Sequence, residues 1–307
     1  MRPLWIVVLA LASCERDGGA PKPTPTPVPG PWTAQCDVRF APRPDRDPSP
    51  MCLVPAAEFV MGRDAPEPHL DLPPHRVRIT RGFYIDQYEV TTEQMVKFAN
   101  TVWNRCEGTE KDACMYEGLS AQYVGFDSAS PTRQLMVRDG RGRIPAKAFL
   151  DGAIAYCQWA GKQLPTEAQW VLAAYHDPAT GKDRLYPWGD TFIPENTYWG
   201  EHGLAGIEPV GSHPGDRSPV GAMDMGGNEH EWVLDGFTRA PACSSGVCVD
   251  PEVPLVDGQR CDGLRCGVRR GGWLHAKTIT NRDQMYLDMP GGFRCVSPQP
   301  AGATRSN

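Results

Sequence analysis

Hydrophobic and polar residues alternate along two segments in the first third of the chain. Residues 52–62 and 75–90 combine this alternation with β-branched and aromatic side chains, which is typical of strands. Within the second segment, Val77 and Ile79 stand between polar neighbours, so one face of that strand is apolar. The pattern predicts strands in both segments, each packed on a core through one face.

A helix is predicted directly after these strands. Thr91 and Gln94 have the spacing of a capping box, in which each side chain binds the backbone of the other residue. The residues that follow place apolar side chains at positions i, i+3, i+4 and i+7 of one helix face, namely Met95, Phe98, Ala99 and Val102.

Two more helices are predicted further along the chain. One covers about residues 146–160 and ends at Gly161, and its apolar face consists of Phe149, Ala153, Ile154 and Cys157. The other begins at a second capping box, formed by Thr166 and Gln169, and ends before Pro178.

Beyond the last predicted helix the chain is expected to be rich in loops. Residues 178–298 have short apolar pieces between Gly, Pro, Asn and Asp, which predicts loops and no long helix. The 32 Gly and 31 Pro make up about a fifth of the 307 residues, against a usual ~12% for the pair. Because Pro breaks helix interiors, this composition argues against a helix bundle. The net charge of −6 gives no reason to expect a nucleic-acid partner.

The N-terminus resembles the export signal of a bacterial lipoprotein. A charged start precedes an apolar run at residues 3–11, which is too short to span a bilayer as a mature helix. Small residues and then Cys14 follow, similar to the lipobox at which such proteins are cut and acylated. The resemblance implies a signal peptide over residues 1–13 and a lipid membrane anchor at acylated Cys14. The alternative is an ordinary signal peptide with a chance cysteine.

A proline-rich tether is predicted after the anchor. Six prolines alternate with small or polar residues before residue 32, which favours extended polyproline II and cannot form a core. We therefore expect an anchor and tether over 14–31, one folded domain over 32–298 and a disordered tail over 299–307. Glu15 directly after the cysteine resembles outer-membrane sorting, so the expected location is the bacterial cell envelope, at the outer membrane.

A series of short motifs in the domain stands in an order that resembles one protein family. The motifs are EFVMG at 58–62, FYIDQYEVT at 83–91, AYCQWAGKQLPTEAQW at 155–170, YPWGD at 186–190, PVG at 209–211, MGGN and EW within 225–232, RGG at 270–272 and GFRC at 292–295. This order is similar to that of the sulfatase-modifying factor family, which contains the formylglycine-generating enzyme (FGE) domain. The resemblance covers about residues 50–297 and implies an α+β fold, a loop-rich variant of the C-type lectin fold.

The resemblance does not extend to the catalytic cysteines of the family. Formylglycine-generating enzymes oxidise a substrate cysteine with two cysteines that bind copper, since thiolates suit the soft Cu(I) ion. The corresponding positions after the Arg-Gly-Gly turn are Ala276 and Asn281, and no cysteine lies between Cys266 and Cys295. The comparison therefore implies a retained scaffold without copper and without catalytic residues.

The resemblance also implies a calcium site. Asp224, Gly227, Glu229 and Glu231 match a family site in which the glycine and the next ligand contribute backbone oxygens. Ca²⁺ takes six to eight oxygen ligands, and carboxylates and carbonyls supply them. Asp224 stands where the enzymes carry Asn, and His230 replaces a usual Trp. The alternative is an acidic loop without a metal.

The cysteines predict a disulfide framework, which suits an exported protein. Cys157 and Cys295 match a family disulfide that would close a loop of well over 100 residues, nominally ~4–5 kcal/mol of stabilisation. The remaining eight cysteines suggest the pairs Cys36–Cys52, Cys106–Cys114, Cys243–Cys248 and Cys261–Cys266. Cross-pairing within residues 243–266 and a zinc site stay open as alternatives.

A binding groove is expected after the Arg-Gly-Gly turn. Trp273, His275, Asn281 and Arg282 fall in the region that lines the family's substrate groove. Such side chains suit a protein, peptide or glycan ligand, although Trp273 and Arg282 could equally be structural. The sequence favours a membrane-anchored, non-catalytic binding protein. Its alternatives are an envelope enzyme acting on a protein side chain with an atypical site, and a structural envelope lipoprotein.

Overall fold

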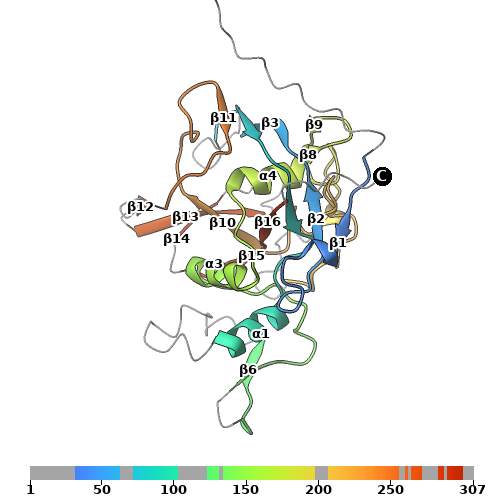
Figure 1. Cartoon of the computed structure of the whole chain (residues 1–307), viewed down its shortest axis with the longest axis vertical. Coiled ribbons are helices and arrows are strands. Elements are labelled where there is room, and N and C mark those ends of the chain that lie inside the picture. Colours follow the sequence, from blue (N-terminus) through green and yellow to red (C-terminus); the bar gives the residue numbers. More distant parts are fainter. Residues whose placement is uncertain are drawn as a thin grey trace, which may run out of the picture.

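The computed structural model shows a central helix surrounded by small sheets and long loops (Figure 1). The structure describes residues 32–62, 72–102, 123–130, 134–197, 207–255, 260–261, 264–271, 283–286 and 289–299. The predicted signal peptide, the acylated Cys14, the tether and most of the predicted tail lie outside these residues. In the described part of the chain, every helix is too short or too polar to cross a membrane.

Three sheets and two hairpins form the β structure of the described residues. The first sheet has the order β1 (Cys36–Asp37), β2 (Met51–Val54), β5 (Phe83–Asp86) and β16 (Val296–Pro298). The second has the order β12 (Arg260–Cys261), β13 (Leu264–Gly271), β10 (His230–Gly236) and β15 (Gly292–Phe293), with β14 (Asp283–Tyr286) also paired to β13. The third has the order β11 (Val247–Val249), β4 (His75–Ile79) and β3 (Ala57–Met61). The hairpins are β6 (Val124–Phe126) with β7 (Leu135–Val137), and β8 (His176–Asp177) with β9 (Lys182–Asp183).

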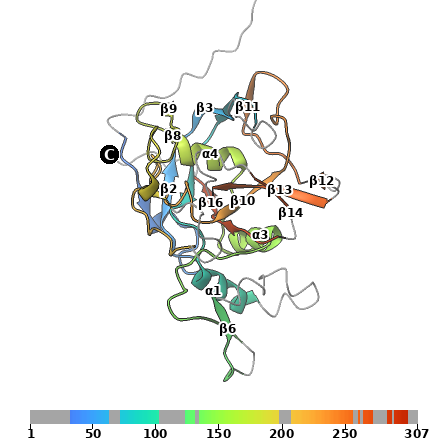
Figure 2. The same ribbon diagram turned by 180° about the vertical axis from the view of Figure 1, so that it is seen from behind.

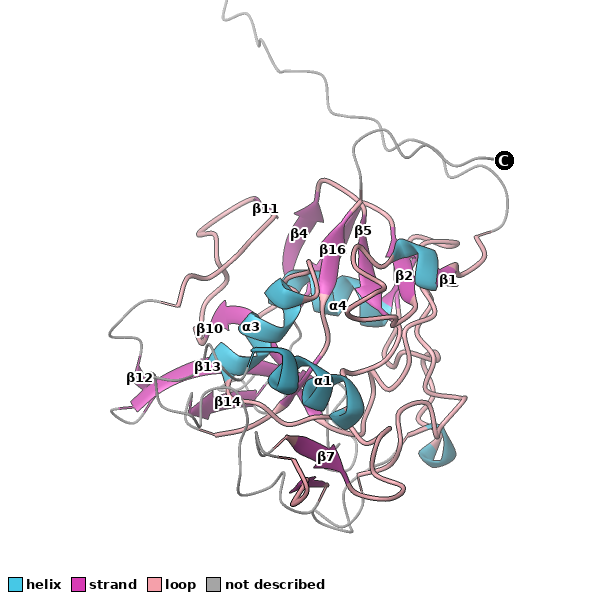
Figure 3. Ribbon diagram, turned by 60° about the horizontal axis from the view of Figure 1, so that its bottom comes forward, coloured by secondary structure: helices cyan, strands magenta, loops and turns pink. Residues whose placement is uncertain are grey.

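The helical elements of the described residues are short. They are α1 (Thr92–Val102), α3 (Leu150–Trp159), α4 (Glu167–Tyr175) and the 3-10 turns η1 (Val38–Phe40) and η4 (Pro194–Asn196). Figure 3 shows how much of the remaining described chain runs as loop. The predicted loop-rich mixture of α and β elements is confirmed.

Both predicted strand segments contain strands and both capping boxes are present, although 75–90 is divided into β4 and β5 and has no strand after Asp86. The segment 52–62 is divided into β2 and β3 at Pro55, which has no backbone N–H to donate to a ladder. Both capping boxes form: Thr91 N donates to Gln94 Oε1 at 2.7 Å, and Thr166 N donates to Gln169 Oε1 at 2.9 Å.

One predicted helix is shorter than expected. The sequence predicts helix from about residue 146, but α3 begins at Leu150. The preceding residues are held extended, because Ala146 N donates to Val90 O at 2.8 Å and Ala148 N donates to Gly291 O at 2.9 Å. These partners are distant in sequence, so the local pattern does not reveal them.

Two apolar cores lie on either side of the second sheet. Helix α4 carries Trp170 and Leu172 into one core, where they meet Phe59, Val77 and Ile85 from the other two sheets. Helices α1 and α3 build the other core, which contains Met95, Phe98, Tyr156, Trp232 and Phe293. Viewed from either side, α4 lies near the middle of the molecule and α1 below it, next to β6 (Figures 1 and 2).

Three of the predicted disulfides are present. Cys157–Cys295 joins α3 to the loop before β16, Cys36–Cys52 joins β1 to β2, and Cys243–Cys248 closes a short loop. Cys106 and Cys114 lie outside the described residues, as do the side chains of Cys261 and Cys266. Their pairing stays a prediction.

Candidate functional site

The predicted calcium loop crosses the middle of the domain and enters β10. Asp224 and Asn228 both have left-handed backbone conformations, with φ of 60° and 62°, which Asp and Asn tolerate better than most residues. Asp224 Oδ2 accepts a 2.6 Å bond from Gly211 N, and Asp224 N donates to Asp216 O. Between them, Gly226 N donates to both carboxylate oxygens of Asp216 at 3.0 Å. The loop is therefore folded around carboxylates.

Glu231, on β10, forms the most deeply buried ion pair of this loop. The guanidinium of Arg294 donates from Nε and Nη2 to the two Glu231 oxygens, both at 2.7 Å, and neither side chain is exposed. Trp170 Nε1 adds a bond to Glu231 Oε2 at 2.9 Å. Arg294 also donates to the carbonyls of Asp86, Gln87 and Met223. A single arginine thus joins the loop, β5 and β10.

A second glutamate, Glu89, lies beneath the same loop. It is 1% exposed, and its oxygens accept from Asn228 Nδ2 at 2.9 Å and from Glu229 N at 3.0 Å. Glu89 follows β5 in the predicted YEVT motif, but nothing in the sequence marks it as a partner of a loop 140 residues later. We call Glu89, Asp216, Asp224 and Glu231 the acidic cluster.

Burial is the main reason that carboxyl pKa values are raised in the acidic cluster. Burial, followed by the charges of Asp224 and Glu231, raises the pKa of Glu89 well above its usual range. Burial and the Asp224 charge do the same to the pKa of Asp216. Burial raises the pKa of Asp224 to about 6, although the Gly211 bond and Arg294 oppose this. A nearby cation favours the ionised form of a carboxyl, so it would oppose this effect of burial.

The donor set fits a hard cation in charge and in ligand type. A carboxylate offers about four acceptor positions, so Glu231 retains capacity beside Arg294 and Trp170. Asp224 Oδ1 is also available, since the bond from Gly211 goes to Oδ2. No three His, Cys, Asp or Glu side chains in the described residues group as a metal site. An ion here would depend on backbone oxygens as well, which is the arrangement that the resemblance implies for Gly227 and Glu229.

The side chain of Glu229 has another partner. It forms a buried ion pair with Lys147, with Nζ and Oε2 2.5 Å apart. Gly292 lies against it, and a Cβ at that position would stand 2.7 Å from Glu229 Cγ. The Glu229 side chain is therefore engaged with Lys147, which agrees with a ligand role for its carbonyl alone, as the resemblance implies.

The first two residues of the Arg-Gly-Gly turn are held in place by contacts with α4 and β10. Arg270 forms a buried ion pair with Glu167 on α4 at 2.5 Å, and its neighbour Gly271 pairs with His230 across β10 and β13. Gly271 has φ of 68°, and a Cβ there would lie 3.2 Å from Trp170. The predicted groove residues Trp273, His275, Asn281 and Arg282 lie outside the described residues, and so does Ala276. Their role stays a prediction.

A second buried ionic group was not foreseen from the sequence. Lys162 Nζ lies 2.7 Å from Asp47 Oδ2 and 2.6 Å from Asp86 Oδ1, and none of the three side chains is more than 1% exposed. We call these residues the lysine cluster. Asp86 Oδ2 also accepts from Cys295 N, next to Arg294. The sequence points to this lysine only through the motif at 155–170, in which it is the last residue of Ala-Gly-Lys, and the motif does not indicate its partners.

Comparison with known proteins identifies the family. The sulfatase-modifying factor enzyme 1-like domain matches residues 38–297. The formylglycine-generating enzyme of Bos taurus is 29% identical over 296 residues, covering 81% of this chain and 75% of the bovine protein. The inactive C-alpha-formylglycine-generating enzyme 2 of Bos taurus is 27% identical over 277 residues, covering 80% and 87%.

A solved structure has the same fold. PvdO from Pseudomonas aeruginosa superposes with a TM-score of 0.56 at 21% identity, covering 89% of this chain and all of PvdO. The likeness agrees with the loop-rich, lectin-like α+β architecture described above. On the domain match across residues 38–297, the chain belongs to the sulfatase-modifying factor family.

Proposed function

We propose that the protein is a non-catalytic member of this family that binds a protein, peptide or glycan at the bacterial cell envelope. The observation that carries this proposal is the missing pair of copper-binding cysteines. Ala276 and Asn281 stand at their positions, and the chain has no cysteine between Cys266 and Cys295. Neither a methyl group nor an amide binds Cu(I) as a thiolate does, so no oxidation step is assigned to these residues.

The rest of the domain supports a retained binding scaffold. The Arg270–Glu167 pair and the Gly271 turn hold the start of the predicted groove against α4. One relative carries the word inactive in its name, so the family includes proteins without the enzyme's activity. Ca²⁺ held by Asp224 and Glu231, with carbonyls of Gly227 and Glu229, would fix the loop that precedes β10. Anchoring through Cys14 would place the domain at the membrane surface.

The catalytic part of the proposal is tested with a sulfatase-type C-x-P-x-R peptide. The purified domain is incubated with the peptide, oxygen and copper, and peptide mass is followed for conversion of the cysteine to an aldehyde. We expect no conversion, while the bovine formylglycine-generating enzyme serves as a positive control. Aldehyde formation by this chain would show that it is an enzyme with an atypical site.

The anchoring part is tested separately. Full-length protein is produced in a bacterial host, and membranes are separated from soluble fractions. The wild-type chain should be found in the membrane fraction, and Cys14→Ala should be soluble. If Cys14→Ala stays with the membranes to the same extent, the lipid anchor is wrong.

A further inference from the structure

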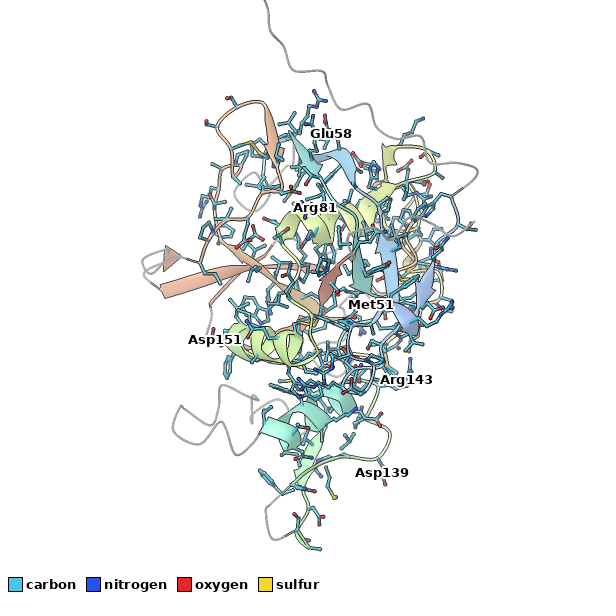
Figure 4. All side chains as sticks on the ribbon, in the orientation of Figure 1. Met51, Glu58, Arg81, Asp139, Arg143 and Asp151 are labelled. Carbon is cyan, nitrogen blue, oxygen red and sulfur yellow. A yellow bond between two sulfur atoms is a disulfide. The ribbon has the colours of Figure 1, made fainter. Side chains whose placement is uncertain are left out.

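A cavity lies away from the Arg-Gly-Gly turn and from the acidic cluster. It has a volume of about 450 Å³, within the range of small-ligand sites. Its walls come from the β4–β5 turn, β16, the segment leading into α4 and the loop after β11. Four segments that are distant in sequence therefore meet around one space. Figure 4 labels Arg81, which lines this cavity at the level of α4.

Charged side chains of both signs line the cavity. Arg81 and Glu252 are exposed, and neither forms an ion pair or hydrogen bond with another residue of the described chain. Asp250 is exposed as well, and Thr80 binds both of its oxygens, with N donating to Oδ1 at 2.8 Å and Oγ1 donating to Oδ2 at 2.5 Å. The cavity wall thus carries one cation and two anions, and each Asp250 oxygen keeps further acceptor positions for a ligand with opposite charges on separate groups.

Amide groups complete the polar walls. The capping box fixes the side chain of Gln169, since its Oε1 accepts from Thr166 N at 2.9 Å. This bond leaves Gln169 Nε2 as a donor in the cavity wall, without a protein partner in the described residues. Gln163 contributes a second, exposed amide. Such amides match the donors and acceptors of a peptide backbone.

The cavity is held in place before any ligand arrives. Asp235 accepts from Glu167 N at 2.6 Å and from Val253 N at 2.8 Å, so it ties the start of α4 to the loop that carries Glu252. Two backbone bonds between Gln163 and Val296, of 2.9 and 2.7 Å, fix the opposite wall. Fixed walls reduce the ordering cost of binding.

The apolar lining residues offer no platform for a sugar ring. Among the described lining residues Phe83 alone is aromatic; it is 2% exposed, and Val296 is 1% exposed. A neutral sugar would also leave the charges of Arg81 and Glu252 unused. The lining therefore favours a charged, polar ligand over a neutral glycan.

We propose that this cavity binds a short zwitterionic peptide. Its carboxylate pairs with Arg81, its amino group pairs with Asp250 and Glu252, and its amides bind Gln163 and Gln169. The site is separate from the groove after the Arg-Gly-Gly turn, so it adds to the proposed function and does not depend on it.

The test uses the dipeptide lysyl-aspartate as probe and the full folded chain as receptor. Binding is followed by isothermal titration, with an uncharged blocked dipeptide, N-acetyl-alanyl-alanine amide, and maltose as comparison ligands. We expect binding of the free dipeptide only. Arg81→Ala and Glu252→Ala should each weaken it about tenfold or more, since each removes a bond to a charged group.

Controls separate this site from general charge effects and from misfolding. Arg217→Ala and Asp139→Ala change exposed charges elsewhere and should leave binding unchanged. All four variants alter exposed residues, so their thermal unfolding should match that of the wild type. The proposal is overturned if lysyl-aspartate does not bind at millimolar concentration, if Arg81→Ala and Glu252→Ala bind it like the wild type, or if maltose or the blocked dipeptide binds equally well.

Discussion

The lysine cluster and the acidic cluster bury similar groups but balance them differently. In the lysine cluster, one ammonium stands between two carboxylates at 2.6 and 2.7 Å. In the acidic cluster, four carboxylates share mainly the guanidinium of Arg294. In the lysine cluster the two carboxyl pKa values shift in opposite directions, since Lys162 lowers that of Asp47 against the effect of burial and burial raises that of Asp86 to about 6. In the acidic cluster the pKa of every shifted carboxyl is raised. Each carboxylate of the lysine cluster therefore has an ammonium within 2.7 Å, whereas in the acidic cluster only Glu231 pairs directly with a cation.

The two clusters also meet. Asp86 of the lysine cluster accepts from Cys295 N at 2.9 Å, and the preceding residue, Arg294, pairs with Glu231. The Cys157–Cys295 disulfide ties this junction to α3. The bond from Cys295 N to Asp86 therefore also helps to hold Arg294 in place beside Glu231.

Removal of Lys162 should have the largest effect. Lys162→Ala leaves Asp47 and Asp86 buried without their cation, which costs about 3–5 kcal/mol of unfolding free energy. Chemical unfolding of the two proteins measures the difference. Lys97→Ala is the matched control, because Lys97 is exposed and donates only to the Asp45 carbonyl. A loss as small as that of the control would show that the lysine cluster does not stabilise the fold.

The second-largest effect is expected from Ca²⁺, which should stabilise the acidic cluster and not the lysine cluster. Ca²⁺ at about 100 times its Kd should stabilise the wild type by about 3 kcal/mol, by mass action. Asp224→Ala should abolish this gain, because it removes a ligand carboxylate, while Asp139→Ala should retain it. Thermal unfolding with Ca²⁺ and with chelator measures the effect. An identical melting temperature in both conditions would contradict a calcium site at Asp224 and Glu231.

The pH dependence in chelator gives the smallest expected effect. A carboxyl with a raised folded pKa binds its proton more tightly in the folded state, so stability falls as pH rises from its unfolded pKa to its folded one. For Asp224 this window runs from about 4 to about 6. Asp224→Asn should therefore reduce the loss of unfolding free energy across this window by about 2 kcal/mol, somewhat less than two pKa units represent.

The lysine cluster provides the contrast for that measurement. Its two carboxyls shift in opposite directions, Asp47 downward and Asp86 to about 6, so their contributions partly cancel over the same window. Unfolding is followed at several pH values between 4 and 7.5 for the wild type and Asp224→Asn. Superimposable pH profiles would show that Asp224 is not a source of the dependence.

The sequence predicts the parts of this fold that are set by neighbours along the chain. The capping box of Thr166 and Gln169 depends on residues three positions apart, and the structure contains it. The disulfides Cys36–Cys52 and Cys243–Cys248 also join close positions. The helix predicted from residue 146 was placed too early, because the partner of Ala148 is Gly291.

The candidate site is less accessible to sequence reasoning. Family motifs contain Glu89, Glu231 and Arg294, but their pairing spans 63 residues for Arg294 with Glu231 and 139 for Glu89 with Asn228. No single motif marks the cavity near Arg81, because its walls come from four separate segments, and the family motifs contain only Phe83, Gln163, Thr166 and Gln169 of its lining. The grouping of buried carboxylates and the Nε2 donor of Gln169 in the cavity wall can be recognised only once the fold brings distant segments together.

The sequence by itself determined the family, the missing cysteine pair at Ala276 and Asn281, and the local elements, because these depend on residue identity and short spacing. Only the tertiary structure decided which charges are buried together. Burial removes water from a carboxylate, and its pKa then depends on whichever partner the fold brings within a few ångströms. That is why Lys162 pairs with both acids of one group, whereas Arg294 pairs directly only with Glu231 in the other.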